Sequence, residues 1–411
     1  MFRISLNKNK ACLSALLVLL SFRVSAQILT HEDSISAGLN IKGNRATAIS
    51  GYGEAFYTQD FNNKIATAQL KRAVLFIGHR FNEKITFFSE MELEDAVVSG
   101  DAKGEIAMEQ CFLKFDLTRN LYVNAGLFTP RLGVINENHL PNTFYGNERP
   151  VLETMVIPTT WRELGVSFYG TVPSMPALNY SLGIFNGLNA KGFSLESGIK
   201  DGRAEGFKAS ARNKAIIGSL LYYLGNYRIQ LAGYAGGSNG LDDKTSSFIG
   251  LSTGFFGTPV YLGDFNVQYR NNGWFGKAQA TQISIPDAQQ ITTAYANNCP
   301  GKILGALGEL GYDFFYKKWK GEKQFHAFGR YEYIDMNGKL PESGLANPYF
   351  TQQHFFLGFS YLPVRGVVIK ADYHHILNGE FNQSLVVNPP PYQLPYATSR
   401  GYLNLGLAYS F

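Results

Sequence analysis

Apolar and polar side chains alternate along many short stretches of this chain. Within 177–187, apolar side chains at the even-numbered positions alternate with polar or small ones such as Asn179 and Ser181. The stretches 259–270 and 352–362 show the same period of two. Successive side chains of a β-strand point to opposite faces, so each stretch predicts a strand with one apolar face and one polar face.

Sixteen stretches carry this pattern, which predicts an all-β chain. An even number of antiparallel strands is what a single-chain bacterial β-barrel requires. A two-layer soluble sandwich would also alternate, so the pattern alone does not separate the two architectures. The predicted strands lie near 48–58, 68–80, 84–95, 105–117, 121–129, 161–171, 177–187, 206–213, 227–237, 259–270, 273–284, 303–316, 323–335, 352–362, 366–377 and 400–411.

The connections between the predicted strands sort by length. Short links such as 81–83 and 271–272 follow the even-numbered strands, and long links follow most odd-numbered strands. This arrangement is typical of outer-membrane barrels and not of Greek-key sandwiches. We therefore predict one transmembrane antiparallel β-barrel of about sixteen strands, with short periplasmic turns and long extracellular loops. The exception is 214–226, a longer link whose apolar run 216–224 could form a small helix.

The last residues of the chain form a strand pattern that is apolar to its final position. Leu405, Leu407, Tyr409 and Phe411 share one face, and the other face is small or polar. This ending resembles the closing-strand signal by which outer-membrane barrels are recognised for insertion. The signal implies the barrel assembly machinery as a partner, through Asn404, Gly406, Tyr409 and Phe411.

The first residues have the layout of a secretory signal peptide. A basic start is followed by the apolar run 11–22 and by a small-residue cleavage site that ends at Ala26. The apolar run is too short to span a bilayer as a helix, which takes about 20 residues. We predict a signal peptide over 1–26, an N-terminal periplasmic segment over 27–46, and an outer-membrane barrel over 47–411. The predicted location is the bacterial outer membrane.

Composition agrees with a membrane barrel. Beyond the leader there is no apolar run of 18 residues, while aromatic side chains are plentiful, with 24 Tyr and 31 Phe. The chain has 37 Lys and Arg against 32 Asp and Glu, but four of the basic residues lie in 1–26, which leaves 33 against 32. The near-neutral remainder does not indicate a nucleic-acid partner. Cys111 and Cys299 are too few for a disulfide scaffold, and we expect free thiols.

Charged side chains on the inner faces of the strands are the first candidates for pore-lining residues. Glu90, Glu92 and Glu94 share one face of a predicted strand, and they would be costly against lipid, so we predict that they point into the lumen. The other inward candidates have both signs and nearly balance. They are Arg72, Lys114, Asp116, Lys208, Arg212, Asp264, Lys277, Glu309, Asp313, Arg330, Glu332, Lys370 and Asp372.

The long link 130–160 is the loop that we expect to fold into the pore. It contains four prolines, which can hold a fixed path without regular secondary structure. Mixed charge at a constriction screens solutes by size and charge. The candidate constriction residues are Arg131, Glu148, Arg149 and Glu153.

Motifs for catalysis, metals and cofactors do not stand out. Two stretches, 236–240 and 250–254, match the G-x-S-x-G pattern, but neither lies between a predicted strand and a helix, as a nucleophile elbow requires. His374 and His375 point to opposite faces of one strand and cannot share a metal ion there. We therefore predict no enzyme activity, no cofactor and no metal site.

Short segments spread along the chain carry a family resemblance. They are FSEMELE at 88–94, GLFTPRLG at 126–133, NERP at 147–150, IPTTWRELG at 157–165, GIFNG at 183–187, ASAR at 209–212, AFGRYE at 327–332 and GFSYLP at 358–363. In order and spacing they resemble the phosphate-selective porin O and P family. The resemblance implies a sixteen-stranded, homotrimeric, passive channel with an inward-folded third loop.

The leading functional prediction is a porin that passes small hydrophilic solutes or ions, with anions such as phosphate among them. Relatives that select phosphate are expected to cluster arginines and lysines in the lumen, whereas this chain interleaves them with carboxylates. We therefore expect weak ion selectivity and no strong block by phosphate. The alternative is a secreted soluble β-sandwich binding protein, either sugar-binding or adhesin-like.

Overall fold

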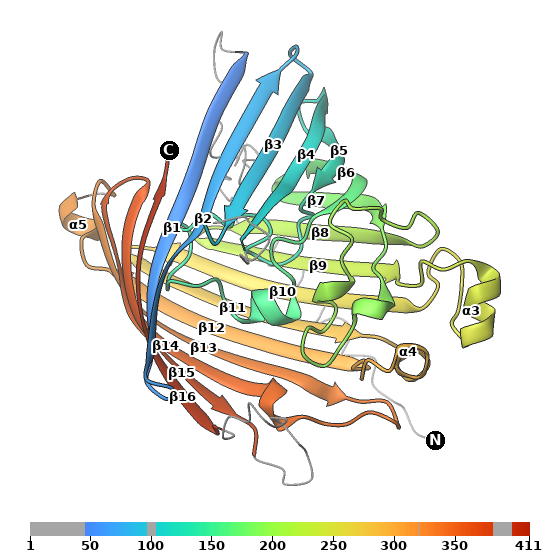
Figure 1. Ribbon diagram of the computed structural model, residues 1–411. Coiled ribbons are helices and arrows are strands. Elements are labelled where there is room, and N and C mark those ends of the chain that lie inside the picture. The colour runs from blue at the N-terminus through green and yellow to red at the C-terminus, as the bar shows by residue number, and fades with distance from the viewer. Residues whose placement is uncertain (1–45, 97–103, 320, 381–396) are drawn as a thin grey trace, which may run out of the picture.

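The computed structural model describes residues 46–96, 104–319, 321–380 and 397–411, and shows one closed antiparallel β-barrel of sixteen strands (Figure 1). Each strand pairs with its neighbours in sequence, so a two-layer sandwich is not favoured. The strands are β1 Thr47–Asp60, β2 Ile65–Arg80, β3 Ile85–Glu94, β4 Glu105–Thr118, β5 Leu121–Phe128, β6 Glu163–Val172, β7 Met175–Asn186, β8 Lys214–Leu224, β9 Tyr227–Gly237, β10 Pro259–Asn271, β11 Trp274–Ser284, β12 Lys302–Asp313, β13 Gln324–Lys339, β14 Thr351–Val364, β15 Val367–Asn378 and β16 Ser399–Ser410.

The last strand closes the barrel against the first. β16 pairs with β1 in a register that places Tyr52 opposite Ser410, and Phe411 exchanges two backbone hydrogen bonds with Gly51. Leu407 and Tyr409 are 51% and 44% exposed on the outside. The alternation read from the terminal residues is thus confirmed. Closure leaves no unpaired strand edge, as backbone groups within a bilayer require.

The outer wall is apolar because period-two alternation turns the apolar side chains outward. On β14, Leu357 and Phe359 are 69% and 52% exposed, while His354 and Ser360 of the same strand are buried toward the lumen. A soluble protein of this size would not expose so many large apolar side chains in one contiguous band. The wall is suited to lipid.

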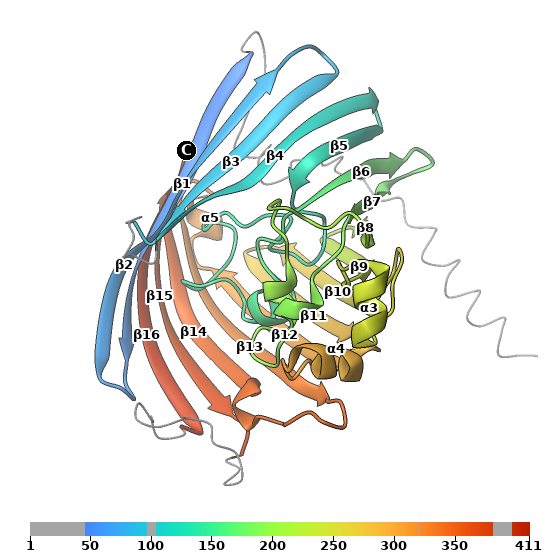
Figure 2. The ribbon, with the colours of Figure 1, turned by 45° about the vertical axis from the view of Figure 1, so that its right-hand side comes forward.

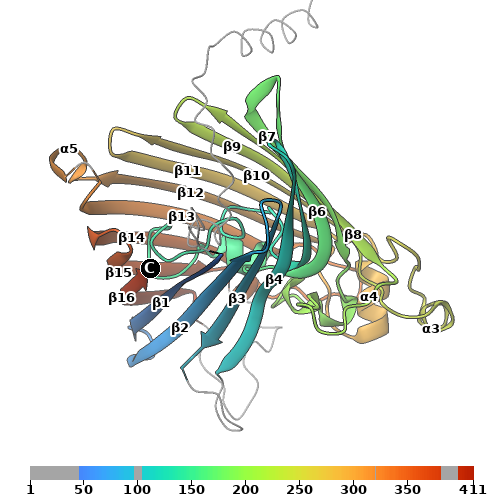
Figure 3. The same ribbon diagram turned by 90° about the horizontal axis from the view of Figure 1, so that it is seen from above.

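The two rims differ as expected from the connection lengths. The connections after β5, β7, β9, β11 and β15 are long, and two of them carry the helices α3 (Asp243–Ile249) and α4 (Ala288–Tyr295) at one end of the strands. The short helix α5 (Tyr316–Trp319) lies at the opposite end (Figure 3). Short 3₁₀ turns, at Ala190–Gly192, Lys200–Gly202 and Pro348–Phe350, complete the long-loop rim.

The eighth strand corrects the sequence reading. We expected a strand over 206–213 and a helical link over 214–226, but β8 is Lys214–Leu224 and pairs with β7 at Ile184 opposite Ile216. Its inner face carries Ile217 and Leu221, which are 2% and 3% exposed. Because both faces of β8 are apolar, the period of two is hidden in its sequence.

This correction also changes the position of two predicted pore-lining residues. Lys208 and Arg212 lie in the connection before β8, not on a strand, and both are exposed. Arg212 pairs with Asp243 at the start of α3, with 2.6 Å between Nη2 and Oδ1. The pore-lining assignment of these two residues was wrong, because it depended on the misplaced strand.

The structure tests only some of the remaining predictions about the termini, the cysteines and membrane-spanning helices. The predicted signal peptide and nearly all of the predicted periplasmic segment lie outside the described residues. Cys111 and Cys299 are free, as expected. Among the described residues, no helix is both long and apolar enough to cross a membrane.

The interior of the barrel holds a folded loop. The connection 129–162 enters the space enclosed by the strands and contains the five-residue π-helix η1, Leu152–Val156 (Figure 2). Trp161, Leu132 and Leu152 of this loop are completely buried in one apolar cluster that also includes Ile217 on the inner wall. The inward folding of the third loop on this rim was expected, and its packing against the wall explains why β8 is apolar inside.

Candidate functional site

The loop 129–162 is bound to β13 and β15 by charged side chains that meet its backbone. Arg330 donates from Nη1 to the carbonyl oxygen of Tyr145 over 3.0 Å, and Lys370 donates from Nζ to that of Phe144 over 3.1 Å. Asp372 accepts hydrogen bonds from the backbone N–H and the side-chain amide of Asn147, at 2.7 and 2.5 Å. The loop backbone thus supplies partners for the charged groups of the wall.

The π-helix η1 is held in the same manner. Glu332 accepts from the Leu152 backbone N–H at 2.7 Å. Glu153 turns back into its own loop and accepts from the N–H groups of Val134 and Ile135 at 2.7 and 2.6 Å. Burial raises the pKa of Glu153 to about 7, although the Lys277 ammonium and these hydrogen bonds act in the opposite direction.

The charges behind this contact form a buried network across three strands. Arg330 on β13 lies 3.2 Å from Glu309 on β12 and 2.8 Å from Glu332, and Lys277 on β11 lies 3.7 Å from Glu309. All four side chains are at most 6% exposed. Such a network is stable only while each charge keeps its partner.

A second group of charges lies on β1, β2 and β3. Arg72 contacts Glu54 at 2.6 Å, Glu92 at 3.3 Å and Glu94 at 3.7 Å. The predicted inward face of β3 is therefore correct, and the predicted Arg72 lies against it. One guanidinium is thus shared among three carboxyl groups of the wall.

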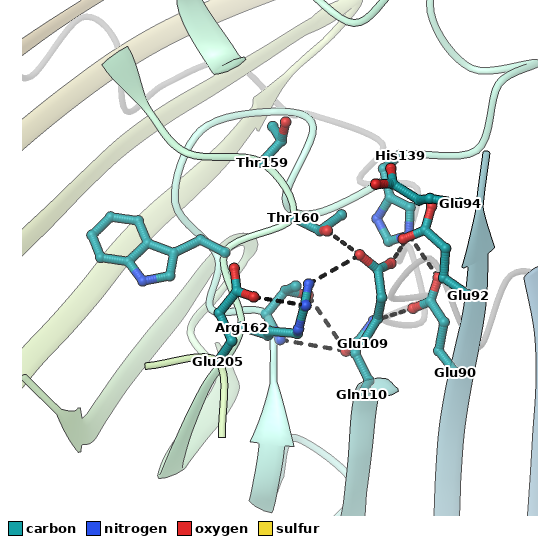
Figure 4. Close-up of polar contacts among 12 residues, drawn as sticks. Glu90, Glu92, Glu94, Glu109, Gln110, His139, Thr159, Thr160, Arg162 and Glu205 are labelled. Carbon is teal, nitrogen blue, oxygen red and sulfur yellow. Dashed lines mark hydrogen bonds and ion pairs between the residues drawn. The ribbon is translucent and has the colours of Figure 1, made fainter. Parts of the chain in front are cut away.

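Glu109 is a site residue that the sequence analysis missed. The register between β3 and β4 shifts between Glu90 and Met91, which leaves Glu109 as the extra residue of a β-bulge. As a result Glu109 and Gln110 both point inward, although strict alternation would place Glu109 against lipid (Figure 4). No local sequence signal marks such a bulge.

Glu109 joins the wall to the end of the loop. Its Oε1 accepts from the Thr160 hydroxyl and from Arg162 Nη1, the latter at 3.3 Å. Arg162 also contacts Glu205 of the β7–β8 connection at 2.9 Å (Figure 4). His139 lies on the other side of Glu109, with 3.9 Å between Nε2 and Oε2.

An open cavity of about 360 Å³ lies between the loop and the inner wall of β9–β14. The loop side includes Glu137 and Asn138, and the wall side includes Arg228, Arg270 and Lys277. Arg228 forms an ion pair with Glu137, whereas Arg270 stacks on Phe275, 4.6 Å from the ring centroid. Among the described residues, Arg270 has no acidic side chain within ion-pair distance.

The other predicted residues lie at different depths. Lys114 and Asp116 form a partly exposed pair at 3.1 Å, away from the loop contacts. Of the predicted constriction residues, Arg131 is buried and pairs with Glu137 at 3.3 Å, and Glu148 is exposed. Arg149 is half-buried.

Arg228 and Arg270 were also absent from the candidate list. The alternation of β10 places Arg270 on the same face as Asp264 and Asn266, so a signal for it was present. Both arginines lie near the short-turn ends of their strands. From the sequence, side chains at these ends could equally belong to the rim of the barrel. Their position beside the cavity depends on the path of the loop.

Comparison with known proteins supports the fold and does not show a family. No family model matches the chain. Over 344 residues it is 29% identical to an uncharacterised protein of Aquifex aeolicus (strain VF5), covering 80% of this chain and 75% of that protein. The resemblance to the phosphate-selective porin O and P family therefore stays a prediction.

Solved structures of similar fold are outer-membrane barrels. OmpF of Salmonella typhi, in complex with daunomycin, matches with a TM-score of 0.55 and 11% identity over 89% of this chain and 97% of that chain. The anion-selective porin from Comamonas acidovorans matches with a TM-score of 0.52 and 10% identity over 89% and 99%. The chain has the sixteen-stranded transmembrane β-barrel fold found in outer-membrane porins.

Proposed function

We propose that this protein is a passive channel of the bacterial outer membrane for small hydrophilic solutes and ions. The observation that carries the proposal is the polar cavity of about 360 Å³ beside the inward loop, inside a closed barrel with an apolar outer wall. Hydrogen bonds from the wall hold the loop at several points, so the size and lining of the opening beside it are fixed. A fixed constriction lined by charged and polar groups selects solutes by size and charge.

The charges beside the cavity support weak ion selectivity. Arg228 shares the Glu137 carboxylate with Arg131, and Lys277 lies 3.7 Å from Glu309. Arg270 adds one cation without an acidic partner among the residues that the structure describes. One such group favours small anions slightly. It is not the cluster of cations that strong binding of phosphate requires.

Single-channel recording in a planar bilayer tests this function. Under a KCl gradient we expect discrete open steps with a small reversal potential of the sign for anion preference, and little change when phosphate is added. Strong cation selectivity or a tight block by phosphate would refute the proposed selectivity. Protein that migrates as a folded, heat-modifiable barrel but gives no channels would refute the porin function itself.

We further propose assembly as a homotrimer and insertion through the barrel assembly machinery. A hollow of about 640 Å³ in the outer wall, over β1, β2, β15 and β16, is lined by small or apolar groups such as Ala55, Ala68 and Leu407, and can receive side chains of a second copy. Phe411 is 71% exposed at the end of β16, where a receptor can reach it. Native mass spectrometry in mild detergent tests the trimer, and deletion of Phe411 should reduce the amount of folded barrel in the outer membrane.

A further inference from the structure

Three side chains with metal-ligand chemistry meet where the loop touches β3 and β4. Glu90 on β3, Glu109 on the bulge of β4 and His139 in the loop are each at most 1% exposed. One potential ligand atom of each lies within 4.8 Å of those of the other two (Figure 4). This group lies on the far side of the loop from the cavity residues of β9–β11.

Neighbouring donors orient both carboxylates. Gln110 donates from Nε2 to Oε2 of Glu90 at 2.7 Å, which leaves Oε1 of Glu90 directed at His139 Nε2 over 2.9 Å. Thr160 and Arg162 occupy Oε1 of Glu109, which leaves Oε2 directed at the same nitrogen over 3.9 Å. Hydrogen-bonded outer partners that fix one oxygen of each carboxylate are a usual feature of metal sites.

The gathering of three buried carboxyl groups, Glu90, Glu92 and Glu109, beside His139 is the observation that points to a cation. Besides its hydrogen bonds with Thr160 and Arg162, Glu109 forms one with the neighbouring carboxyl group of Glu92. A single proton on His139 Nε2 can serve Glu90 at 2.9 Å, but it does not reach Glu109 at 3.9 Å. Carboxyl groups buried side by side repel each other when ionised, and a bound cation offsets this cost.

We propose that Glu90, Glu109 and His139 bind a divalent transition-metal ion of the zinc class. Two carboxylates and one neutral imidazole match the ligand preference of Zn²⁺, whose bonds to oxygen and nitrogen are about 2.0–2.2 Å long. Small side-chain movements bring the three atoms to that distance around a shared centre. The two negative charges of Glu90 and Glu109 balance the ion.

The ion would connect β3, β4 and the loop at one point. Its role is to hold the loop end near His139 against the wall, where Tyr52 already packs edge-to-face on the imidazole ring at 6.1 Å. The site does not line the cavity. The test of metal binding therefore does not depend on which solutes pass through the channel.

The test uses the full chain, folded in detergent and freed of metal with a chelator. We expect one Zn²⁺ bound per chain by calorimetry, and a visible absorption band from Co²⁺ at the same stoichiometry. His139→Gln and Glu109→Gln should each lower the affinity by at least about tenfold and remove the Co²⁺ band. His326→Gln is the matched control, since His326 is a buried histidine on the wall strand β13 that contacts Tyr145 instead of these carboxylates. It should change neither the affinity for Zn²⁺ nor the Co²⁺ band.

Glu109→Gln keeps the shape of the side chain, and heat-modifiable gel migration confirms that each of the three Gln variants is folded. Absence of Zn²⁺ binding by the folded protein at equimolar concentration would overturn the proposal. Equal binding by all four proteins would also overturn it, because the ion would then be held by other histidines.

Discussion

Two parts of the inner wall carry similar residues and use them differently. On β12, β13 and β15, charged side chains such as Arg330 and Asp372 are at most 6% exposed and are bonded to each other and to the loop backbone. On β9 and β10, Arg228 and Arg270 border the open cavity. The first region is bonded to the loop backbone, whereas the second leaves Arg270 beside the cavity without an acidic partner among the residues that the structure describes.

This difference shows why counting inward charges does not predict selectivity. Most of the candidates on β12–β15 have their charge compensated by a partner within a few ångströms, so a solute in the cavity experiences little of their field. The field at the constriction is set by the few groups that keep water and lack a partner. The following predictions test this division, from the largest expected effect to the smallest.

Removal of Arg330 should have the largest effect. Arg330→Ala leaves Glu309 and Glu332 buried without their common partner and removes the hydrogen bond to Tyr145, so we expect a loss of about 3–5 kcal/mol in the free energy of unfolding. Urea unfolding of the refolded barrel in detergent measures it. Lys114→Ala, which breaks the partly exposed pair with Asp116, serves as the control and should cost less than about 1 kcal/mol. Equal losses would contradict a structural role for the buried network.

Glu153 should make stability depend on pH. Its pKa is raised from 4.5 to about 7 in the folded protein, so the folded state takes up a proton before the unfolded chain does. The contribution of this group is fully present below about pH 4.5 and is lost as the pH rises through about 7, with a total of about 3 kcal/mol. Glu153→Gln keeps the acceptor for Val134 and Ile135 and should flatten this part of the curve. Unfolding followed by tryptophan fluorescence at several pH values compares the two proteins, and parallel curves would contradict the prediction.

A methyl group at Gly406 should disturb the loop. The added Cβ would overlap the Asn147 side chain, which would have to move away from Asp372. We expect Gly406→Ala to cost about 1–3 kcal/mol and to make the open-channel current noisier. Gly308→Ala is the matched control, because nothing lies within 4 Å of its added Cβ. If both variants behave like the parent, Asn147 does not fix the loop.

Reversal of charge at Arg270 should leave stability within about 0.5 kcal/mol and still change the channel. Arg270→Glu replaces the cation beside the cavity by an anion, so the reversal potential under a KCl gradient should shift toward cation preference. Arg365→Glu makes the same charge change in the exposed β14–β15 turn, away from the cavity lining. A shift of equal size in both variants would show that selectivity is a property of total charge.

Fifteen of the sixteen strands could be found from alternation because one face of each meets lipid. β8 escaped because Ile217 on its inner face meets the apolar loop cluster, so neither face is polar. Lys208 and Arg212 were misplaced for the same reason. The strand was missed because its inner face contacts the folded loop there instead of water.

The site was predictable in part for a related reason. Glu90, Arg330 and Asp372 have the parity of inward residues, and parity is a local property. Glu109 reaches the lumen through a bulge, and the bulge depends on the pairing of β3 with β4. His139 approaches it from 30 residues further along, which only the folded loop brings about.

The sequence by itself determined the closed barrel, its apolar outside, the rim with long loops and the loop that folds inward. These features follow from the alternation within each strand and the length of each connection, which are local properties of the sequence. Only the tertiary structure decided which charges neutralise each other, which border the cavity, and where Glu90, Glu109 and His139 meet. Those relations join strands and a loop that are distant in sequence, and electrostatic interaction depends on separation in space and on exposure to water.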